Sequence, residues 1–67
     1  MVLALSAADV GSRVVVRRRV SGGDRPLYTD LLGELLVLSD AEVVILTSAG
    51  EVRVPRNEIH RAKTVPA

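Results

Sequence analysis

This chain contains no cysteine, tryptophan or phenylalanine, and Tyr28 is its only Phe, Trp or Tyr residue. Without cysteine it can form neither a disulfide nor a thiolate metal site. Its interior must therefore be built from Val, Leu, Ile and Ala. His60 is the single histidine. Cys-His catalysis is excluded because there is no cysteine, and so small a chain offers little room to bring His60 together with a serine and an aspartate for Ser-His-Asp catalysis. We expect no enzymatic activity from this chain alone, and no catalytic, cofactor-binding or metal-binding residues.

Long apolar runs are also missing. No stretch approaches the roughly 18 apolar residues that span a bilayer, and the apolar start at residues 1–5 lacks the basic region of a signal peptide. We therefore expect no membrane partner and a cytoplasmic location. Arginine dominates the basic residues, and with the Ala, Val, Leu and Gly bias it hints at a GC-rich bacterial genome.

The chain also lacks an excess of charge of one sign. The nine Lys and Arg residues are almost cancelled by eight acids, which leaves a net charge of +1. The acids are scattered over turns and strand ends, which favours solvated rim positions over calcium or magnesium binding. Gly22 and Gly23 lack both the following Lys-Ser/Thr and the helix of a phosphate loop. We interpret them as part of a flexible loop.

The β-branched and alternating segments predict five strands. They cover residues 13–20, about 31–38, 42–47, 51–54 and 60–65. Gly33 is a candidate for a bulge or sharp bend, and Gly50 is expected to take positive φ in a tight hairpin turn. Residues 56–59 suit a single 3-10 turn. Residues 1–9 form a separate segment in which Ser6 and Asp9 suggest a capped helical turn.

Together these elements predict an all-β fold, an SH3-like small barrel over residues 10–66 with a short 3-10 turn before its last strand. The OB-fold is a rival, because it is also a five-stranded barrel. An OB-fold usually carries a helix between its third and fourth strands, and here only Ser48, Ala49 and Gly50 fill that gap. The SH3-like arrangement is favoured for this reason.

The second and third predicted strands are apolar on both faces. Successive side chains of a strand point to opposite sides of the sheet, and a 67-residue chain buries only about 60% of its unfolded surface. A lone small barrel cannot cover both sides of these strands. The surplus of aliphatic side chains therefore predicts a docking surface for a protein partner, either a fused domain or another copy. Its candidate residues are Leu32, Leu36, Leu38, Val44 and Leu46.

An arginine-rich face offers an alternative, namely a small barrel that binds nucleic acid. Its candidate residues are Arg13, Arg17, Arg19, Arg53 and Arg56. Two observations weigh against it, because the acids cancel most of the charge and single-strand binding usually uses several aromatic platforms. Alternate arginines also protect an exposed edge strand from aggregation.

Three segments in this order resemble a known family. Residues 10–18 (VGSRVVVRR), 29–35 (TDLLGEL) and 50–56 (GEVRVPR) are similar to the pattern G-x-R-V-V-V-R-x-R, T-D-x-L-G-E-L and G-x-V-x-V-P-R. This pattern is that of the N-terminal SH3-like domain in actinobacterial GNAT-type N-acetyltransferases. The tail at residues 62–66 resembles the junction into the acetyltransferase domain.

The resemblance implies an accessory domain. The acetyl-CoA site of that family lies in the downstream domain, so no catalytic or cofactor residue carries over to this chain. It also implies a barrel that is normally packed against a larger domain, in agreement with the surplus of aliphatic residues.

Overall fold

The computed structural model describes residues 2–20 and 27–66, so the predicted flexible loop at Gly22 and Gly23 lies outside the described residues. The described chain is almost entirely strand. Its elements are β1 (Val2–Ala4), the 3-10 turn η1 (Ala7–Asp9), β2 (Arg13–Val20), β3 (Leu27–Leu38), β4 (Glu42–Thr47), β5 (Gly50–Pro55), the 3-10 turn η2 (Arg56–Glu58) and β6 (Ile59–Thr64).

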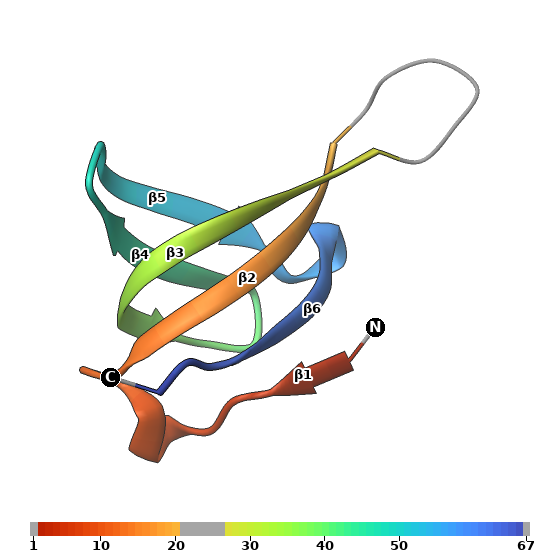
Figure 1. Ribbon diagram of the computed structural model, residues 1–67. Coiled ribbons are helices and arrows are strands. Elements are labelled where there is room, and N and C mark those ends of the chain that lie inside the picture. Colours follow the sequence, from red (N-terminus) through yellow and green to blue (C-terminus); the bar gives the residue numbers. More distant parts are fainter. Residues whose placement is uncertain (1, 21–26, 67) are drawn as a thin grey trace.

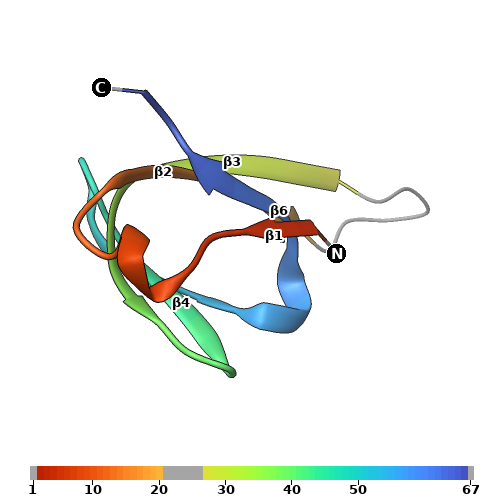
Figure 2. The ribbon, with the colours of Figure 1, turned by 90° about the horizontal axis from the view of Figure 1, so that it is seen from below.

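All the described strands belong to one sheet, in the order β1-β6-β2-β3-β4-β5. Strands β2 to β5 form an antiparallel meander, and β6 returns to pair antiparallel with β2. The sheet curls strongly on itself, and η2 forms the corner between β5 and β6 (Figures 1 and 2). The all-β small barrel with a 3-10 turn before its last strand is confirmed.

The core lies on the concave side of this sheet and is entirely apolar among the described residues. Alternation selects it, because every second residue of a strand faces inward. On β2 the alternate residues Val14 and Val16 are fully buried. The buried cluster consists of Val14, Val16, Leu35, Val43, Ile45, Val54, Ile59 and Ala62.

Gly33 was a candidate for a bulge or a sharp bend, and the bulge does not fall at this residue. It stays in register opposite Val14, and the register shift of β3 falls between Leu35 and Val37. Gly33 instead permits a close approach of two backbones. A Cβ built on it would overlap the carbonyl oxygen of Leu46 on β4. The missing side chain therefore lets β3 and β4 approach where the sheet curls.

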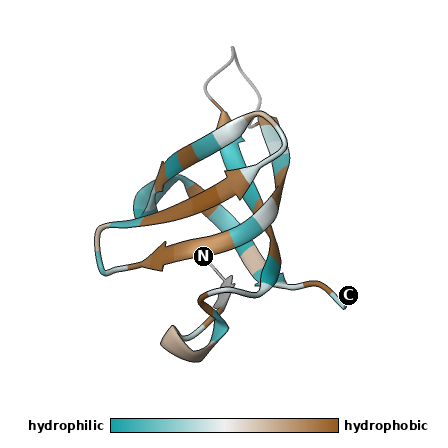
Figure 3. Cartoon of the chain, turned by 90° about the vertical axis from the view of Figure 1, so that its left-hand side faces the viewer, coloured by the Kyte–Doolittle hydropathy of each residue, from teal (hydrophilic) through white to brown (hydrophobic). Residues whose placement is uncertain are grey.

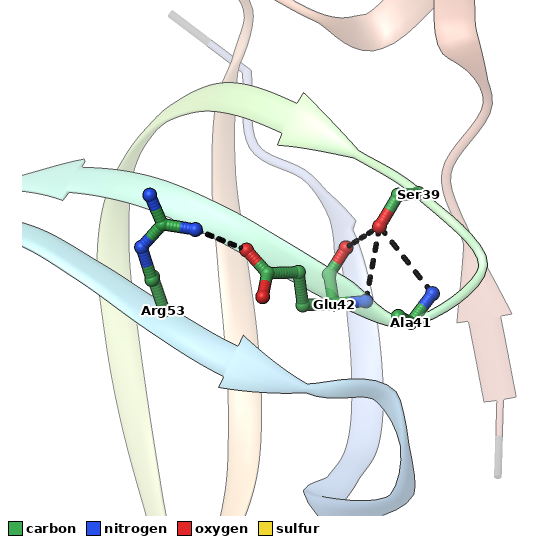
Figure 4. Close-up of polar contacts among 4 residues, drawn as sticks. All are labelled: Ser39, Ala41, Glu42 and Arg53. Atoms are coloured by element: carbon green, nitrogen blue, oxygen red, sulfur yellow. Dashed lines mark hydrogen bonds and ion pairs between the residues drawn. The ribbon is translucent and has the colours of Figure 1, made fainter.

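The short turns follow their sequence signals. The Asp9 carboxylate accepts a hydrogen bond of 2.8 Å from the Ser6 backbone N–H, which fixes η1 as expected from the capping pattern. Gly50 takes φ +113° at the β4–β5 hairpin, as predicted. At the β3–β4 turn the Ser39 hydroxyl donates to the Glu42 carbonyl and accepts from two backbone N–H groups (Figure 4).

Two features of the strands were not predicted. Strand β3 begins at Leu27, four residues before its expected start at Leu31, because these residues pair with the end of β2. Strand β1 pairs in parallel with β6 over three residues. Three residues are too few to show an alternation of apolar and polar positions, so the sequence carried no signal for β1.

Candidate interaction surface

The outer side of the curled sheet carries an apolar strip. Residues opposite each other in the register share a face, and the residues between core positions face outward. The strip crosses β2, β3 and β4 through the pairs Val15–Leu32 and Val37–Val44, with Leu46 beside them on β4. In Figure 3 the strands that face the viewer are hydrophobic over long stretches of their length. We call these five residues the outer strip.

The docking residues predicted from the sequence divide between two environments. Leu32 and Leu46 lie on the outer strip and are each 44% exposed. Val44 also faces outward but is only 2% exposed. Leu36 is half-buried, and Leu38 is half-buried against the core cluster. The accessible apolar surface is therefore centred on Leu32 and Leu46.

Val37 belongs to the same surface and was missed. It is 45% exposed and lies opposite Val44. The bulge between Leu35 and Val37 puts it on the outer face. A simple odd-even count along β3 assigns it to the inner face, so only the position of the bulge could have identified it.

A salt bridge helps to cover Val44. Arg53 lies opposite Val44 on β5, and its Nη1 reaches Glu42 Oε2, 2.6 Å away on β4 (Figure 4). Glu42 lies two residues before Val44 on β4, so the two side chains share the outer face. The aliphatic stem of Arg53 therefore runs beside Val44, as long basic side chains commonly do over apolar surface.

Most of the predicted basic face is engaged within the chain. Arg17 Nε lies 2.9 Å from Asp30 Oδ1, Arg53 pairs with Glu42, and Arg56 Nη1 donates to the Ser39 carbonyl over 2.6 Å. The hydrogen bond from Arg17 lowers the pKa of the Asp30 carboxyl, and the same bond raises the pKa of Arg17. Arg13 and Arg19 are exposed, and neither forms an ion pair within the described ranges.

Arg18 follows the buried Val14 and Val16 in the alternation of β2 and would face inward if the alternation continued. It lies at the register shift between β2 and β6, where its guanidinium pairs with Glu58 Oε1 of η2 at 2.9 Å. The ion pair at the rim of the core satisfies this charge. It also ties η2 to β2, which fixes the corner from which β6 starts.

An aromatic pair lies at one end of the outer face. The rings of Tyr28 and His60 are 4.4 Å apart between centroids and tilted by 37°. Arg19 lies opposite Tyr28 on β2, and Arg61 lies opposite Arg17. The sequence indicated no partner for His60. The pairing was missed because the two residues are far apart in the chain and meet across β2.

Within the part of the chain that the structure describes, no group of three or more His, Cys, Asp or Glu side chains is placed to hold a metal ion. The same residues include no helix long and apolar enough to cross a bilayer. Every buried side-chain polar atom described has a hydrogen-bond partner.

Strands β2 to β6 form a curled antiparallel sheet, and a 3-10 turn leads into its last strand. This arrangement defines a small β-barrel domain of the SH3-like and Sm-like class. The sequence comparison places it more narrowly. Residues 8–63 match the family described as the Rv0428c N-terminal Sm-like domain, and the chain belongs to that family. No curated protein and no solved structure matches it significantly.

Proposed function

We propose that this domain is a non-catalytic docking module whose outer strip packs against a GNAT-type acetyltransferase domain of the same polypeptide. The exposure of Leu32, Val37 and Leu46 on one face carries this proposal. The family description, which names an N-terminal domain, and the resemblance of residues 10–66 to actinobacterial acetyltransferases support the choice of partner. A cytoplasmic location accords with this role.

The energetics fit a modest interface. Complete burial of a Leu or Val side chain is worth roughly 1.5 to 3 kcal/mol, so covering each half-exposed residue of the strip adds about 1 kcal/mol. Glu34 and Glu51 flank Leu46 in the register. An apolar centre with a charged rim is the usual anatomy of a protein interface.

The proposal is tested by replacing Leu32 and Leu46 together with serine. We expect the variant to lose its affinity for the acetyltransferase domain encoded in the same reading frame, measured by titration calorimetry with the separated domains. Val10→Ser is the matched control, because Val10 is an exposed aliphatic outside the strip. Equal affinity of both variants and the parent chain would overturn the proposal.

Since no catalytic role is assigned to the barrel, incubation of this chain alone with acetyl-CoA and an amine acceptor should give no turnover. Acetylated product from the isolated chain would contradict the non-catalytic assignment. The full polypeptide serves as the positive control.

A second candidate function is nucleic-acid binding, favoured by the Tyr28–His60 pair beside Arg19 and Arg61. Aromatic rings beside cations form the kind of platform on which single-stranded bases stack. This function predicts a salt-sensitive mobility shift with a single-stranded oligonucleotide. The combined variant Arg19→Ala, Arg61→Ala should abolish the shift, whereas Arg13→Ala should leave it largely intact. The absence of a shift at low salt would eliminate this candidate.

A further inference from the structure

The outer edge of β5 presents backbone groups in a defined pattern. β5 ends the sheet order of the described strands, and the pair Thr47–Gly50 closes its hairpin with β4. In such a hairpin the closing residues are hydrogen-bonded, and bonded and non-bonded pairs alternate from there. Gly50, Val52 and Val54 therefore turn their N–H and C=O groups toward β4. Glu51 and Arg53 turn theirs outward.

Pro55 supports this assignment. It has the same parity as Glu51 and Arg53, so its nitrogen also points away from β4. A proline is tolerated in a sheet where its missing N–H faces outward from an edge strand. The backbone hydrogen bonds of the turns and loops in the described ranges likewise include none to Glu51 or Arg53.

We propose that this edge pairs with β5 of a second copy of the chain, antiparallel and centred on Val52. In this register Glu51 lies opposite Arg53 of the second copy, and Arg53 lies opposite its Glu51. All of these residues carry outward N–H and C=O groups, so each pair exchanges two hydrogen bonds. The two copies are related by a two-fold axis, the commonest symmetry of protein dimers.

Side-chain charge selects this register over its neighbours. Side chains directly opposite in an antiparallel pair interact strongly, and opposite charges stabilise the pair while like charges destabilise it. A shift of the second strand by two residues in either direction, which keeps the hydrogen-bonding parity, places Glu51 opposite Glu51 or Arg53 opposite Arg53. Only the register centred on Val52 places opposite charges together at both sites. The edge is therefore complementary to itself.

The extent of the pairing is limited by the chain itself. Pro55 has no N–H to donate and would lie opposite Ala49 of the second copy, whose N–H already bonds Thr47 Oγ1 at 3.1 Å. The pairing between the two copies therefore ends at Gly50 opposite Val54, the next pair after each Glu51–Arg53 pair. Because the two edges occupy each other, a dimer leaves no further β5 edge for growth, and the association closes at two copies.

Charge exchange tests this dimer separately from docking through the outer strip. Sedimentation equilibrium of the parent chain should show a concentration-dependent monomer–dimer equilibrium. Glu51→Arg or Arg53→Glu alone places like charges together and should weaken association on the order of tenfold. The double variant Glu51→Arg, Arg53→Glu restores the opposite pairs between the two copies and should recover most of the association, although the Arg53–Glu42 pair within each copy is lost. Circular dichroism checks that each variant is folded.

A backbone readout locates the contact. Amide hydrogen exchange at Glu51 and Arg53 should slow as the concentration rises, while Val52 and Val54, already bonded to β4, should change little. The paired substitution of Leu32 and Leu46 by serine should leave the dimer intact. A monomer at all concentrations, failure of the double variant to recover association, or a dimer abolished by the Leu32 and Leu46 substitutions would each overturn the proposal.

Discussion

Gly33 shows how one absent side chain shapes the barrel. Its Cβ position is occupied by the backbone of Leu46 and approached by the Ile45 side chain at 2.9 Å. Gly33→Ala must push β3 away from β4 at the point where the sheet curls. We expect a loss of about 2 to 3 kcal/mol in the free energy of unfolding, measured by urea denaturation.

Gly50→Ala is the informative comparison for that variant. The site has open space around it, and its cost comes from φ +113° instead of from contact. A loss of about 1 kcal/mol is expected there. If Gly33→Ala were as mild as Gly50→Ala, the close approach of β3 and β4 would not control the curl.

The Arg17–Asp30 pair gives the stability a dependence on acid pH. The hydrogen bond from Arg17 holds the pKa of Asp30 below its ordinary value in the folded state. Such a carboxylate contributes stability that is fully present above its unfolded pKa and lost as the pH falls through its folded pKa. We expect Asp30→Asn to be less stable than the parent chain at pH 7, by a small amount because both side chains are partly exposed.

The difference between the two chains should vanish in strong acid. Urea denaturation of both proteins at pH 7 and again well below the folded pKa of Asp30 measures it. Asp40→Asn serves as the control, since Asp40 forms no ion pair in the described ranges. A stability gap for Asp30→Asn that stayed constant with pH would show that the carboxylate charge is not the cause.

At the scale of elements, the β3–β4 turn is held from two directions. The Ser39 hydroxyl bonds both backbone groups of Glu42 at 3.0 and 3.1 Å, and Arg56 of η2 donates to the Ser39 carbonyl. Ser39→Ala removes the acceptor of the Glu42 N–H, although the Glu42 carbonyl still accepts from the Ser39 N–H at 3.0 Å. The change should cost about 1 to 2 kcal/mol in thermal or urea unfolding. Ser48→Ala, in the exposed β4–β5 turn, should stay within about 0.5 kcal/mol of the parent chain. Equal effects would mean that the Ser39 bonds are dispensable.

Local sequence pattern sufficed for the elements that it specifies alone. Dense β-branched residues marked β2, Gly50 marked the hairpin turn, and Pro55 marked the end of β5. The bulge after Leu35 and the parallel strand β1 were not predicted, because each depends on how a distant strand pairs. The same limit applies to the candidate surface. Leu32 and Leu46 followed from alternation, whereas Val37 and the Tyr28–His60 pair required the assembled sheet.

At the scale of the whole molecule, stability rests on one small aliphatic core. A domain of 67 residues has a free energy of unfolding of roughly 3 to 10 kcal/mol. Leu35 is fully buried at its centre, and truncation of such a leucine to alanine costs about 2 to 5 kcal/mol. Leu35→Ala should therefore remove a large part of the stability and leave a substantial unfolded population at moderate temperature.

Leu32→Ala, at an outward position of the same strand, separates folding from docking. Since Leu32 is 44% exposed, its truncation should change the unfolding free energy of the isolated domain by less than about 1 kcal/mol. A partner that covers the outer strip binds only the folded state and raises the melting temperature of the parent chain. Leu32→Ala should reduce that rise, because its contact with the partner is lost while its fold is kept. Calorimetric melting with and without the proposed acetyltransferase partner measures both quantities. A Leu32→Ala protein that is as unstable alone as Leu35→Ala would place Leu32 in the core and remove it from the proposed docking surface.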